Sequence, residues 1–512
     1  MIVEAGHSLP SSHEVLSIAS YNVMMPNEND GWWMYKMFLP SVDTAQHAAW
    51  PARRAKLRAR IASADADIVC IQEASGATSA APGRDDFDFM AELGYGGRAA
   101  AKSQRMHCAT FWKQSKVALV GDVIRASRDL ITRFEVLSAR RSGAADAAAA
   151  AAVAAEAPSP AAAGSRVWVV NTHLPAGHQA ARQLRSLHDL TEKIRKCVRR
   201  EAEAEKSQPS VPPQPRRPPN VVIVGDFNSD AAPWREDAAA APPASSLDQF
   251  LRTGVVAKGV ADPTTGELLC TKRPKMHVLG AFRDAYEEGY RCAASAPSSS
   301  PPPTVVYPDL YSKLRVAGLV AGATAGAPPQ WDARLSAALT ASLARMFEGF
   351  GGGVRSESGG GERVLSRAGV SAWDAATRVG APAPKGAATV IMERKQAAGG
   401  VAELSFEEFV GIYRQCLDGG KPWEVAHDLW ATRSEAGCLP PVAALPSALG
   451  APFAARFDRV WFNNNNAGES GGLRVVAVLA TRTDAQTKRN EPLPNAWSAS
   501  DHLMIGASFA LA

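Results

Sequence analysis

The amino-acid sequence predicts an α/β sandwich that is interrupted by a helical insertion. Apolar runs of strand length alternate with amphipathic helical segments over the first 296 residues. The texture then changes to Pro-, Gly- and Ala-rich stretches with helical patterns, and strand-like runs return only after residue 452. Strands that alternate with helices, followed by hairpin-like strands, are typical of a layered α/β domain. A chain of 512 residues is long enough for such a domain plus an insertion.

The individual elements follow from local patterns. We expect strands at 15–23, 66–73, 167–174, 220–228, 456–464, 473–480 and 503–512. We expect helices at 50–64, 178–206 and 246–259, and a helix or turn at 282–289. The stretch 108–124 alternates as a pair of strands, with a turn at Lys113 to Ser115.

The linkers and the insertion divide the chain into parts. One discontinuous domain is expected over 15–296 and 452–512. Within it, an Ala-rich loop is expected at 142–165 and a Pro-rich linker at 207–220, since proline lacks the backbone donor that regular elements need. The helical insertion is expected at 304–450.

Composition excludes several classes of protein. No apolar run reaches the roughly 18 residues that span a bilayer, and no secretory signal is visible, so we expect a soluble protein without a transmembrane segment. The seven cysteines are scattered without a CxxC pair, which favours reduced thiols in the cytoplasm or nucleus. A net charge of +5 permits an anionic substrate, but a solvated surface explains it equally well.

Polar residues stand at the ends of the apolar runs. They lie in SYNV (20–23), IVCIQE (68–73), VWVVNTHL (167–174) and NVVIVGDFN (220–228), and a further motif, SASDH, occupies 498–502. Together these motifs offer carboxylates, amides and imidazoles. Hydrolysis of an anionic phosphodiester needs charge neutralisation, an activated water and a stabilised leaving oxygen, and this set can supply all three.

The residue types suggest a division of labour. Glu73 and Asn22 suit a Mg²⁺ ion, which prefers oxygen ligands. Asp226 could orient a water, and Asn228 could donate to a phosphate oxygen. His502 lies beside a carboxylate in the sequence and suits general acid–base chemistry or phosphate binding.

These motifs resemble the endonuclease/exonuclease/phosphatase superfamily. The matching elements are YN at 21–22, QE at 72–73, NTHL at 171–174, GDFNS at 225–229, FDRVW at 457–461 and SDH at 500–502, in the family's order. Each is weak alone, but the ordered set is specific. The resemblance implies a four-layer α/β sandwich of two packed mixed sheets flanked by helices, and a hydrolase that uses Mg²⁺ or Mn²⁺ on phosphate esters.

The resemblance also implies which residues hold the metal. Glu73 resembles the principal metal ligand, Asn22 lies beside it, and Asp501 is expected near the ion.

The catalytic residues are implied in the same way. Asp226 resembles the residue that activates the attacking water, and Asn228 resembles a contact to the phosphate. His502 resembles the catalytic histidine, and Asp458 the carboxylate that hydrogen-bonds to it; a surface salt bridge is the alternative for Asp458. His173 resembles a second histidine that contacts the scissile phosphate, with a satisfied core histidine as its alternative.

Three stretches are similar to the deadenylase and nocturnin branch of the superfamily: 50–57, 106–120 and 493–511. This similarity favours a 3′–5′ exonuclease whose partner is RNA. Arg53 and Arg54 are candidate phosphate contacts, although the start of a solvated helix is the alternative. A phosphatase or phosphodiesterase acting on a nucleotide, an inositol phosphate or sphingomyelin stays open, because the core motifs are shared.

The insertion contains a segment, 401–417, that resembles the second half of an EF-hand. If Glu408 is the twelfth loop position, positions one, three and five fall on Ala397, Gly399 and Val401, which offer no side-chain oxygen. Ca²⁺ binding is therefore doubtful, and an ordinary amphipathic helix is the alternative. Some plant members of the superfamily have a similar layout. A Ca²⁺-responsive scaffold with an inactive core is the third hypothesis, which the intact acids and histidines disfavour.

Overall fold

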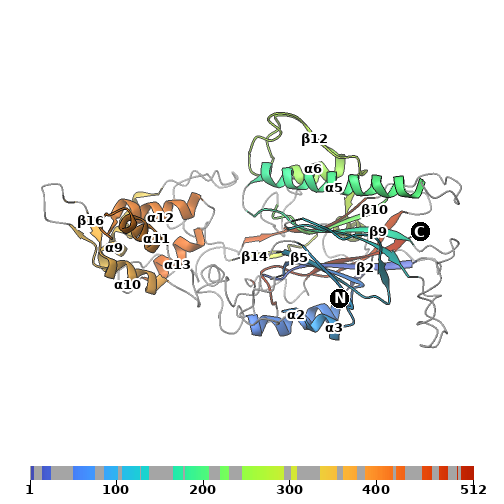
Figure 1. Ribbon diagram of the computed structural model, residues 1–512, viewed down its shortest axis with the longest axis horizontal. Coiled ribbons are helices and arrows are strands. Elements are labelled where there is room, and N and C mark those ends of the chain that lie inside the picture. The colour runs from blue at the N-terminus through green and yellow to red at the C-terminus, as the bar shows by residue number, and fades with distance from the viewer. Residues whose placement is uncertain are drawn as a thin grey trace.

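Figure 1 shows the protein as a computed structural model. The structure describes residues 2–4, 14–24, 50–74, 86–101, 107–126, 128–137, 165–176, 179–206, 219–229, 245–292, 301–307, 335–354, 361, 363–377, 387–418, 422–432, 453–463, 472–481, 493 and 498–511. Apart from their last residues, the Ala-rich loop expected at 142–165 and the Pro-rich linker expected at 207–220 lie outside these ranges. Within the described ranges, no helix has the length and apolarity to cross a membrane.

Two large mixed sheets form the centre of the molecule. The first contains, in spatial order, β1 (Ile2–Glu4), β20 (Leu473–Leu479), β21 (Ile505–Leu511), β2 (Glu14–Asn22), β3 (Ile68–Ala74), β5 (His107–Trp112) and β4 (Gly97–Ala100). The second contains β13 (Phe282–Asp284), β19 (Asp458–Asn463), β10 (Asn220–Asp226), β9 (Arg166–His173), β8 (Leu130–Val136) and β6 (Val117–Leu119), with β7 (Ile124–Arg125) paired to β8. Each sheet has one central parallel pair, β2 with β3 and β9 with β10, and the other pairs are antiparallel.

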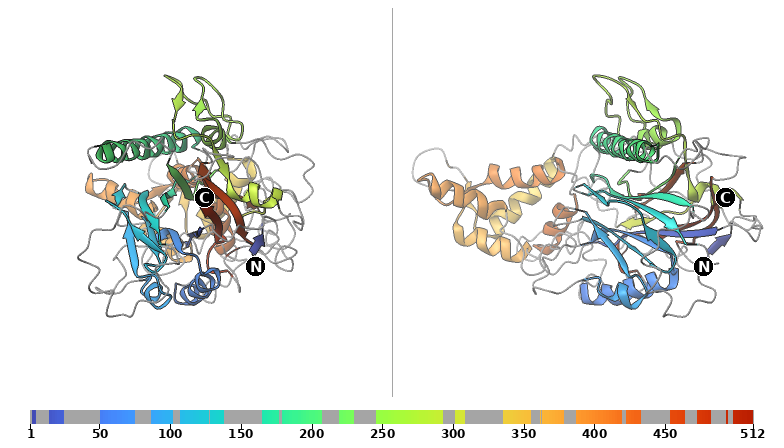
Figure 2. Two further views of the ribbon diagram at one scale, coloured as in Figure 1. Left: turned by 90° about the vertical axis from the view of Figure 1, so that its right-hand side faces the viewer. Right: turned by 45° about the vertical axis from the view of Figure 1, so that its right-hand side comes forward.

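Helices cover both outer faces, so the predicted four-layer α/β sandwich is confirmed (Figures 1 and 2). On the second sheet lie α5 (Ala180–Lys206) and α6 (Ser246–Thr253), with the hairpin of β11 (Val255–Val256) and β12 (Lys275–Met276) beside them. On the first sheet lie α2 (Trp50–Ala64) and α3 (Phe89–Glu92). A further helix, α7 (Ala285–Cys292), follows β13 directly.

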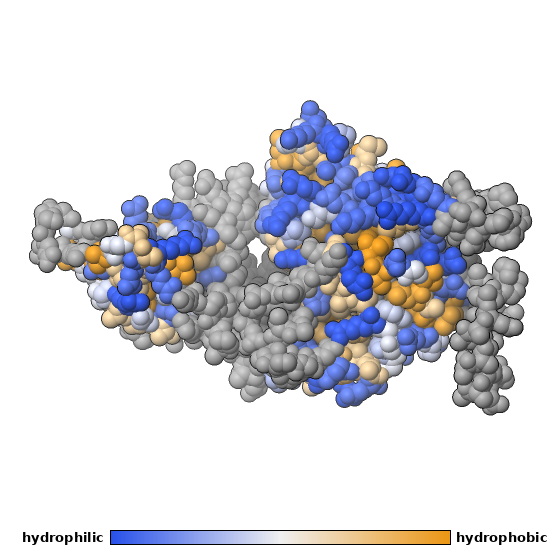
Figure 3. All heavy atoms as spheres, in the orientation of Figure 1, coloured by the Kyte–Doolittle hydropathy of each residue, from blue (hydrophilic) through white to orange (hydrophobic). Residues whose placement is uncertain are grey.

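The apolar pattern of the sequence explains these layers. Leu57 and Ile61, four residues apart on α2, are fully buried against the first sheet. Leu187 and Leu190 do the same for α5 on the second sheet. Between the sheets, strand residues such as Val169 form a third buried cluster. The outward side of α5 is hydrophilic (Figure 3), as expected for an amphipathic helix.

The predicted pairing of two strands within 108–124 is wrong. Both strands exist, as β5 and β6, but β5 pairs with β3 and β4 in the first sheet, while β6 pairs with β8 in the second. The turn after Lys113 therefore passes the chain from one sheet to the other. Alternation along a strand reports burial of its faces, and it carries no information about which strand lies alongside.

The insertion forms a separate helical lobe, which we define as residues 335–432. It contains α9 (Ala337–Gly349), β15 (Gly353–Val354), β16 (Arg363–Leu365), α10 (Arg367–Thr377), α11 (Ala387–Ala397), β17 (Leu404–Ser405), α12 (Phe406–Asp418) and α13 (Pro422–Ala431). The lobe has its own apolar core and stands apart from the sandwich (Figure 1). Two strands flank the lobe in the sequence, β14 (Val305–Tyr307) before it and β18 (Phe453–Ala455) after it. They pair antiparallel, and we call this pair the stem.

The segment that resembles an EF-hand lies within this lobe. Two short strands, β16 and β17, pair in register at Leu365 and Leu404, so two helix–loop–helix units lie side by side. The carboxylate of Glu408 accepts hydrogen bonds from the Ser405 backbone N–H at 2.8 Å and from Lys395 Nζ at 2.6 Å. Ser405 in turn caps the Glu408 N–H at 3.2 Å, which makes a reciprocal capping box at the start of α12. Glu408 therefore stabilises a helix start in this structure.

Candidate active site

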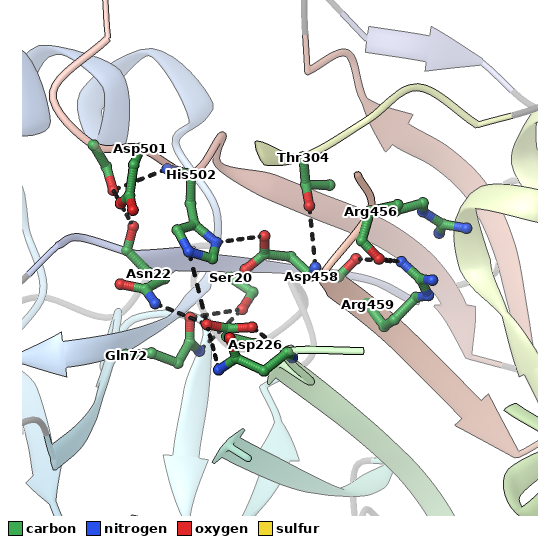
Figure 4. Close-up of polar contacts among 12 residues, drawn as sticks. Ser20, Asn22, Gln72, Asp226, Thr304, Arg456, Asp458, Arg459, Asp501 and His502 are labelled. Carbon is green, nitrogen blue, oxygen red and sulfur yellow. Dashed lines mark hydrogen bonds and ion pairs between the residues drawn. The ribbon is translucent and has the colours of Figure 1, made fainter. Parts of the chain in front are cut away.

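Sheet topology brings the predicted polar residues to one edge of the sandwich. In the first sheet, Asn22 and Gln72 are register partners at the carboxyl ends of the parallel strands β2 and β3. In the second sheet, His173 and Asp226 are partners at the carboxyl ends of β9 and β10. Asp458 begins the antiparallel strand β19 opposite Asp226 and therefore reaches the same edge. Residues from five strands of two sheets thus converge, as Figure 4 shows for several of them.

A backbone irregularity orients Glu73. Its neighbour Gln72 points between the sheets, where Nε2 donates to Asn171 Oδ1 at 2.8 Å, so regular alternation would turn Glu73 to the opposite face. Instead, the pairing of β3 with β5 shifts between Ile71 and Ala74, and Glu73 has a φ of 58°. A bulge with a left-handed residue redirects a side chain at some cost in backbone strain, and such features gather at functional sites.

Asn22 joins the carboxylates of the two sheets. Its Nδ2 donates to Glu73 Oε1 at 3.2 Å. The same Nδ2 donates to Asp226 Oδ2 at 2.9 Å (Figure 4). Its Oδ1 accepts the backbone N–H of Met24 at 3.0 Å, which fixes the orientation of the amide. Since Asn22 is 1% exposed, these hydrogen bonds form away from bulk water.

The GDFN motif forms a tight turn at the end of β10. Gly225 has a φ of 145°, and a Cβ there would lie 1.9 Å from the Thr172 carbonyl oxygen, so only glycine fits. Strand β10 ends at Asp226, whose Oδ1 accepts the Asn228 backbone N–H at 2.8 Å. Asn228 has a φ of 48°, and its Nδ2 donates to the Leu174 carbonyl at 3.0 Å and to Asp226 Oδ2 at 3.1 Å.

His502 and Asp458 form a buried pair. Nδ1 of His502 lies 2.8 Å from Asp458 Oδ2, and its Nε2 faces Asp226 Oδ2 at 3.7 Å (Figure 4). Burial alone would lower the pKa of His502, but the carboxylates of Asp458, Asp226 and Asp501 raise it well above its ordinary value. The arrangement presents a protonated imidazole edge toward Asp226.

His173 also lies beside Asp226. Its Nε2 is 3.6 Å from Asp226 Oδ2 and 3.8 Å from Glu73 Oε1. The ring is buried, and within the described residues its Nδ1 has no hydrogen-bond partner. A satisfied core histidine would have a partner for each ring nitrogen, so the surroundings of His173 resemble those of a ligand-binding group.

Asp501 is a fourth buried carboxyl group at this edge, beside Glu73, Asp226 and Asp458. Burial, together with the nearby carboxylates of Glu73 and Asp226 and against the opposing effect of His502, raises the pKa of Asp501 to about 6. Its Oδ1 accepts a hydrogen bond from Ser500 Oγ at 3.2 Å. Mutual repulsion among these carboxylates is the condition that a bound cation relieves.

The donor set fits a hard divalent cation. Asp226, Asp458 and His502 offer ligand atoms that lie within 4.8 Å of one another, and all three residues are buried. Glu73 joins this group through the hydrogen bonds of Asn22. The carboxylate oxygens of this group are donors that Mg²⁺ and Mn²⁺ favour, whereas the amide oxygen of Asn22 accepts the Met24 N–H in this structure.

The two candidate arginines lie in different surroundings. Arg53 is fully buried, and its Nη1 donates to the carbonyls of Val23 at 2.6 Å and Ala499 at 3.1 Å. It ties together the segments that follow Asn22 and precede Asp501. Arg54 instead forms an ion pair with Asp88 beside α3.

Sequence reasoning missed two residues that hold the site loops. Gln183, on the first turn of α5, donates from Nε2 to the carbonyls of Asn228 at 2.8 Å and Pro175 at 2.9 Å. Thr304, which follows a Pro run, accepts the Asp458 backbone N–H at 3.1 Å. No motif marks either residue, because an isolated Gln on a helix and a Thr after a linker carry no distinctive pattern.

Carboxylate and imidazole groups gathered at one edge of a two-sheet α/β sandwich are groups that a metal-assisted phosphoester hydrolase uses. The chain belongs to the endonuclease/exonuclease/phosphatase family, whose model matches residues 19–502. It is therefore a phosphoesterase of that family, and the resemblance inferred from the motifs is confirmed. No curated protein matches the chain significantly.

Several solved structures are similar to the chain. ANGEL2, described as a 2′,3′-cyclic phosphatase and solved with adenosine-2′,3′-vanadate, is 14% identical, with a TM-score of 0.47 over 98% of this chain and 97% of that chain. The human nocturnin catalytic domain with bound sulfate is 10% identical, with a TM-score of 0.36 over 98% of each chain. D. rerio TDP2 with a single-stranded DNA product is 11% identical, with a TM-score of 0.34 over 97% of this chain and 99% of that chain.

Proposed function

We propose that this phosphoesterase is a Mg²⁺- or Mn²⁺-dependent 3′–5′ exonuclease whose substrate is RNA. The observation that carries the reaction type is the placement of Asp226, which accepts hydrogen bonds from Asn22 and Asn228 and lies near the Nε2 atoms of both His173 and His502. The sequence similarity of 106–120 and 493–511 to the deadenylase branch supports RNA as the substrate.

Each side chain has a task in this proposal. Asp226 orients a water and accepts its proton as the water oxygen bonds to phosphorus. His502, held by Asp458, stabilises the charge that develops on the phosphoryl oxygens, and its position opposite Asp226 supports this role. His173 and Asn228 are proposed to contact the phosphate, with Glu73, Asn22 and Asp501 as the metal residues. A divalent cation bound there would neutralise charge on the phosphoryl group and stabilise the leaving 3′ oxygen.

The arginines have a lesser place in the proposal. Arg53 supports the site through the main-chain carbonyls that it binds, and Arg54 is kept as a weak candidate for contact with the nucleic-acid backbone, since its guanidinium is one-third exposed beside Asp88.

A substrate panel tests the proposal. Purified protein with Mg²⁺ is given oligoadenylate labelled at either end, an oligonucleotide with a blocked 3′ end, a phosphoinositide and sphingomyelin. We expect stepwise release of nucleotides from the free 3′ end only, with loss of activity in EDTA and in Asp226→Asn. Asp65→Asn, which changes an exposed carboxylate that pairs with Lys113, is the matched control and should retain activity.

Two results would contradict the proposal in different ways. Cleavage of the inositol or sphingomyelin substrate alone would replace RNA with a small-molecule or lipid phosphate as the substrate. No cleavage of any phosphoester at micromolar enzyme would overturn the assigned chemistry as a whole.

A further inference from the structure

The stem between the sandwich and the helical lobe lies directly against the His502–Asp458 pair. Its strands β14 and β18 pair antiparallel, with Val305 opposite Ala455. Strand β14 begins one residue after Thr304, and β18 ends three residues before Asp458. Val305 also forms an isolated antiparallel bridge with His502. The lobe is thus attached to the sandwich at the point where the proposed catalytic pair is built.

Thr304 makes hydrogen bonds to the main chain of three residues on two segments at this point. Its N–H donates to the Ala455 carbonyl at 2.8 Å, and its carbonyl accepts the Leu503 N–H at 2.7 Å. Its side-chain Oγ1 accepts the Asp458 N–H at 3.1 Å (Figure 4). The residue is 1% exposed. One residue therefore holds the backbone of Asp458 by its hydroxyl and the backbone next to His502 by its carbonyl.

The geometry of the pair depends on both backbones. The bond of 2.8 Å between His502 Nδ1 and Asp458 Oδ2 joins residues on separate segments, 44 positions apart. Asp458 is the first residue of β19, so its N–H lies at the end of the ladder, where the partner comes from a side chain. Without the hydroxyl, this buried N–H would lose its acceptor, and the first residue of the strand could shift.

We propose that Thr304 is a positioning residue for the Asp458–His502 pair. This inference rests on the proposed function, in which that pair stabilises the reacting phosphoryl group. Thr304 itself does not touch the reacting atoms. It sets the direction from which Asp458 holds the imidazole, and small displacements of such groups reduce turnover strongly.

Three variants test the proposal in the full-length protein. Thr304→Val keeps the shape of the side chain but removes the hydroxyl, and Thr304→Ser keeps the hydroxyl but removes the methyl group. Thr132→Val is the matched control, because Thr132 is also fully buried and its hydroxyl also bonds to a main-chain atom, the Val169 carbonyl at 3.0 Å. Steady-state kinetics on the best substrate are measured together with thermal unfolding.

The expected result is a selective loss of turnover. Thr304→Val should lower kcat by about 10- to 100-fold with KM changed less than about twofold, as for a misplaced catalytic group. Thr304→Ser should recover kcat to within about threefold of the natural protein. Thr132→Val should lose a similar amount of thermal stability but retain its kcat. If folded Thr304→Val retains kcat within about twofold, or if Thr304→Ser loses as much as Thr304→Val, the positioning role is overturned.

A second readout separates this inference from the proposed function. The proton on His502 Nδ1 should give a low-field magnetic resonance signal in protein with isotope-labelled histidine, assigned by its loss in His502→Gln. Thr304→Val should shift or broaden that signal, and Thr132→Val should leave it in place. A wild-type protein that cleaves no phosphoester but shows this pattern would contradict the proposed function alone. An unchanged signal in Thr304→Val would contradict the positioning role alone.

Discussion

The Nδ2 atom of Asn22 lies 2.9 Å from Oδ2 of Asp226, although 204 residues separate them in the chain. This hydrogen bond crosses from the first sheet to the second, and the same amide also donates to Glu73. Asn22 is thus a neutral donor between two acidic groups. Because Asn22 is neutral and donates to both carboxylates, replacing its amide with a carboxylate should destabilise the site.

Asn22→Asp should destabilise the protein when divalent cations are absent. The change removes two buried hydrogen bonds to carboxylates and adds a third negative charge, so we expect a loss of about 2–3 kcal/mol in the free energy of unfolding in EDTA. Excess Mg²⁺ or Mn²⁺ should reduce this difference in unfolding free energy between Asn22→Asp and the natural protein, because a bound cation stabilises the more acidic site more strongly. Asn220→Asp, at the exposed start of β10, is the control. An equal loss with and without the cation would contradict a metal at this site.

Glu73→Gln should abolish activity without lowering stability in EDTA. Glutamine keeps the acceptor oxygen for Asn22, while removing one of the carboxylates that raise the pKa of Asp501. We therefore expect an unchanged or higher melting temperature in EDTA, and a loss of the additional stabilisation that a cation gives the natural protein. Glu92→Gln, whose carboxylate is paired with Arg58 on the surface, should change neither property. A clear drop in melting temperature in EDTA would contradict the repulsion argument.

The raised pKa of His502 predicts an alkaline limit to activity. If the protonated imidazole stabilises the transition state, kcat/KM should fall as the pH rises through the pKa of His502, well above 6.5. The stability of the fold should depend on pH in the same direction. Because the pKa of His502 is raised in the folded protein, its protonated form stabilises the fold at pH values below the pKa of an unfolded histidine. This contribution is lost as the pH rises through the pKa of His502 in the folded protein.

Asp458→Asn should move this alkaline limit to lower pH, because Asp458 is the leading carboxylate that raises the pKa of His502. We also expect kcat to fall by about 100-fold or more, as when a general acid–base group loses its partner. Asp65→Asn, an exposed carboxylate that pairs with Lys113, is the control. A pH profile that stays in place in Asp458→Asn would show that another group sets the limit.

The part of the candidate site that lies at the ends of strands could be predicted from the sequence. Asn22 and Asp226 follow apolar runs, and the carboxyl ends of parallel strands meet at one edge, so their convergence follows from local patterns. The orientation of Glu73 could not be predicted, because its left-handed φ depends on a bulge opposite β5. Periodicity also could not assign β5 and β6 to different sheets, since it records burial and no partner.

Residues that hold the site in place through main-chain contacts are the hardest to predict from a sequence. The similarity to the deadenylase branch makes Arg53 a candidate phosphate contact, with a solvated helix start as the alternative, yet in the structure Arg53 is buried and binds two main-chain carbonyls. Thr304 and Gln183 act through main-chain atoms of distant segments. Such contacts depend on how loops approach each other in three dimensions, which no spacing along the chain encodes.

The buried ion pair between Arg456 and Asp284 should contribute strongly to stability. Arg456 Nη2 lies 2.6 Å from Asp284 Oδ1, which also accepts the Tyr286 N–H at 2.9 Å as a cap of α7. Burial alone would raise the pKa of Asp284, but Arg456 and Arg459 lower it. Arg456→Met should cost about 3–5 kcal/mol, because it leaves a buried charge with less compensation. Adding Asp284→Asn should recover part of that loss.

The pH dependence of this loss has a definite sign. A carboxyl group with a lowered pKa stabilises the fold above its unfolded pKa of about 3.9, and that contribution is lost as the pH falls through the folded value. The difference between the natural protein and Arg456→Met, measured by chemical denaturation, should therefore shrink below about pH 4. Arg195→Met removes a partly exposed surface pair with Glu192 on α5 and should cost far less than Arg456→Met, because solvent screens the pair. A similar cost for both variants would contradict the role of burial.

Glu408 should contribute to stability by capping a helix, independently of Ca²⁺. Its carboxylate accepts the Ser405 N–H and pairs with Lys395, and the Glu408 N–H is capped by Ser405 Oγ. These contacts and its neighbours Lys395 and Ser405 hold the pKa of Glu408 below its usual range despite partial burial, which tends to raise it. Glu408→Ala should therefore cost about 1 kcal/mol in both Ca²⁺ and EDTA.

Glu407→Ala changes the adjacent glutamate on α12 and serves as the matched control. A lobe that bound Ca²⁺ through Glu408 would behave differently. Its thermal transition would rise with Ca²⁺ in the natural protein and lose that response in Glu408→Ala, because a ligand that binds only the folded state raises stability with the logarithm of one plus the ratio of its concentration to Kd. Ala397, Gly399 and Val401 stand at the other ligand positions and offer no side-chain oxygen. We therefore expect that millimolar Ca²⁺ changes the melting temperature of neither the natural protein nor Glu408→Ala, each compared with its own value in EDTA.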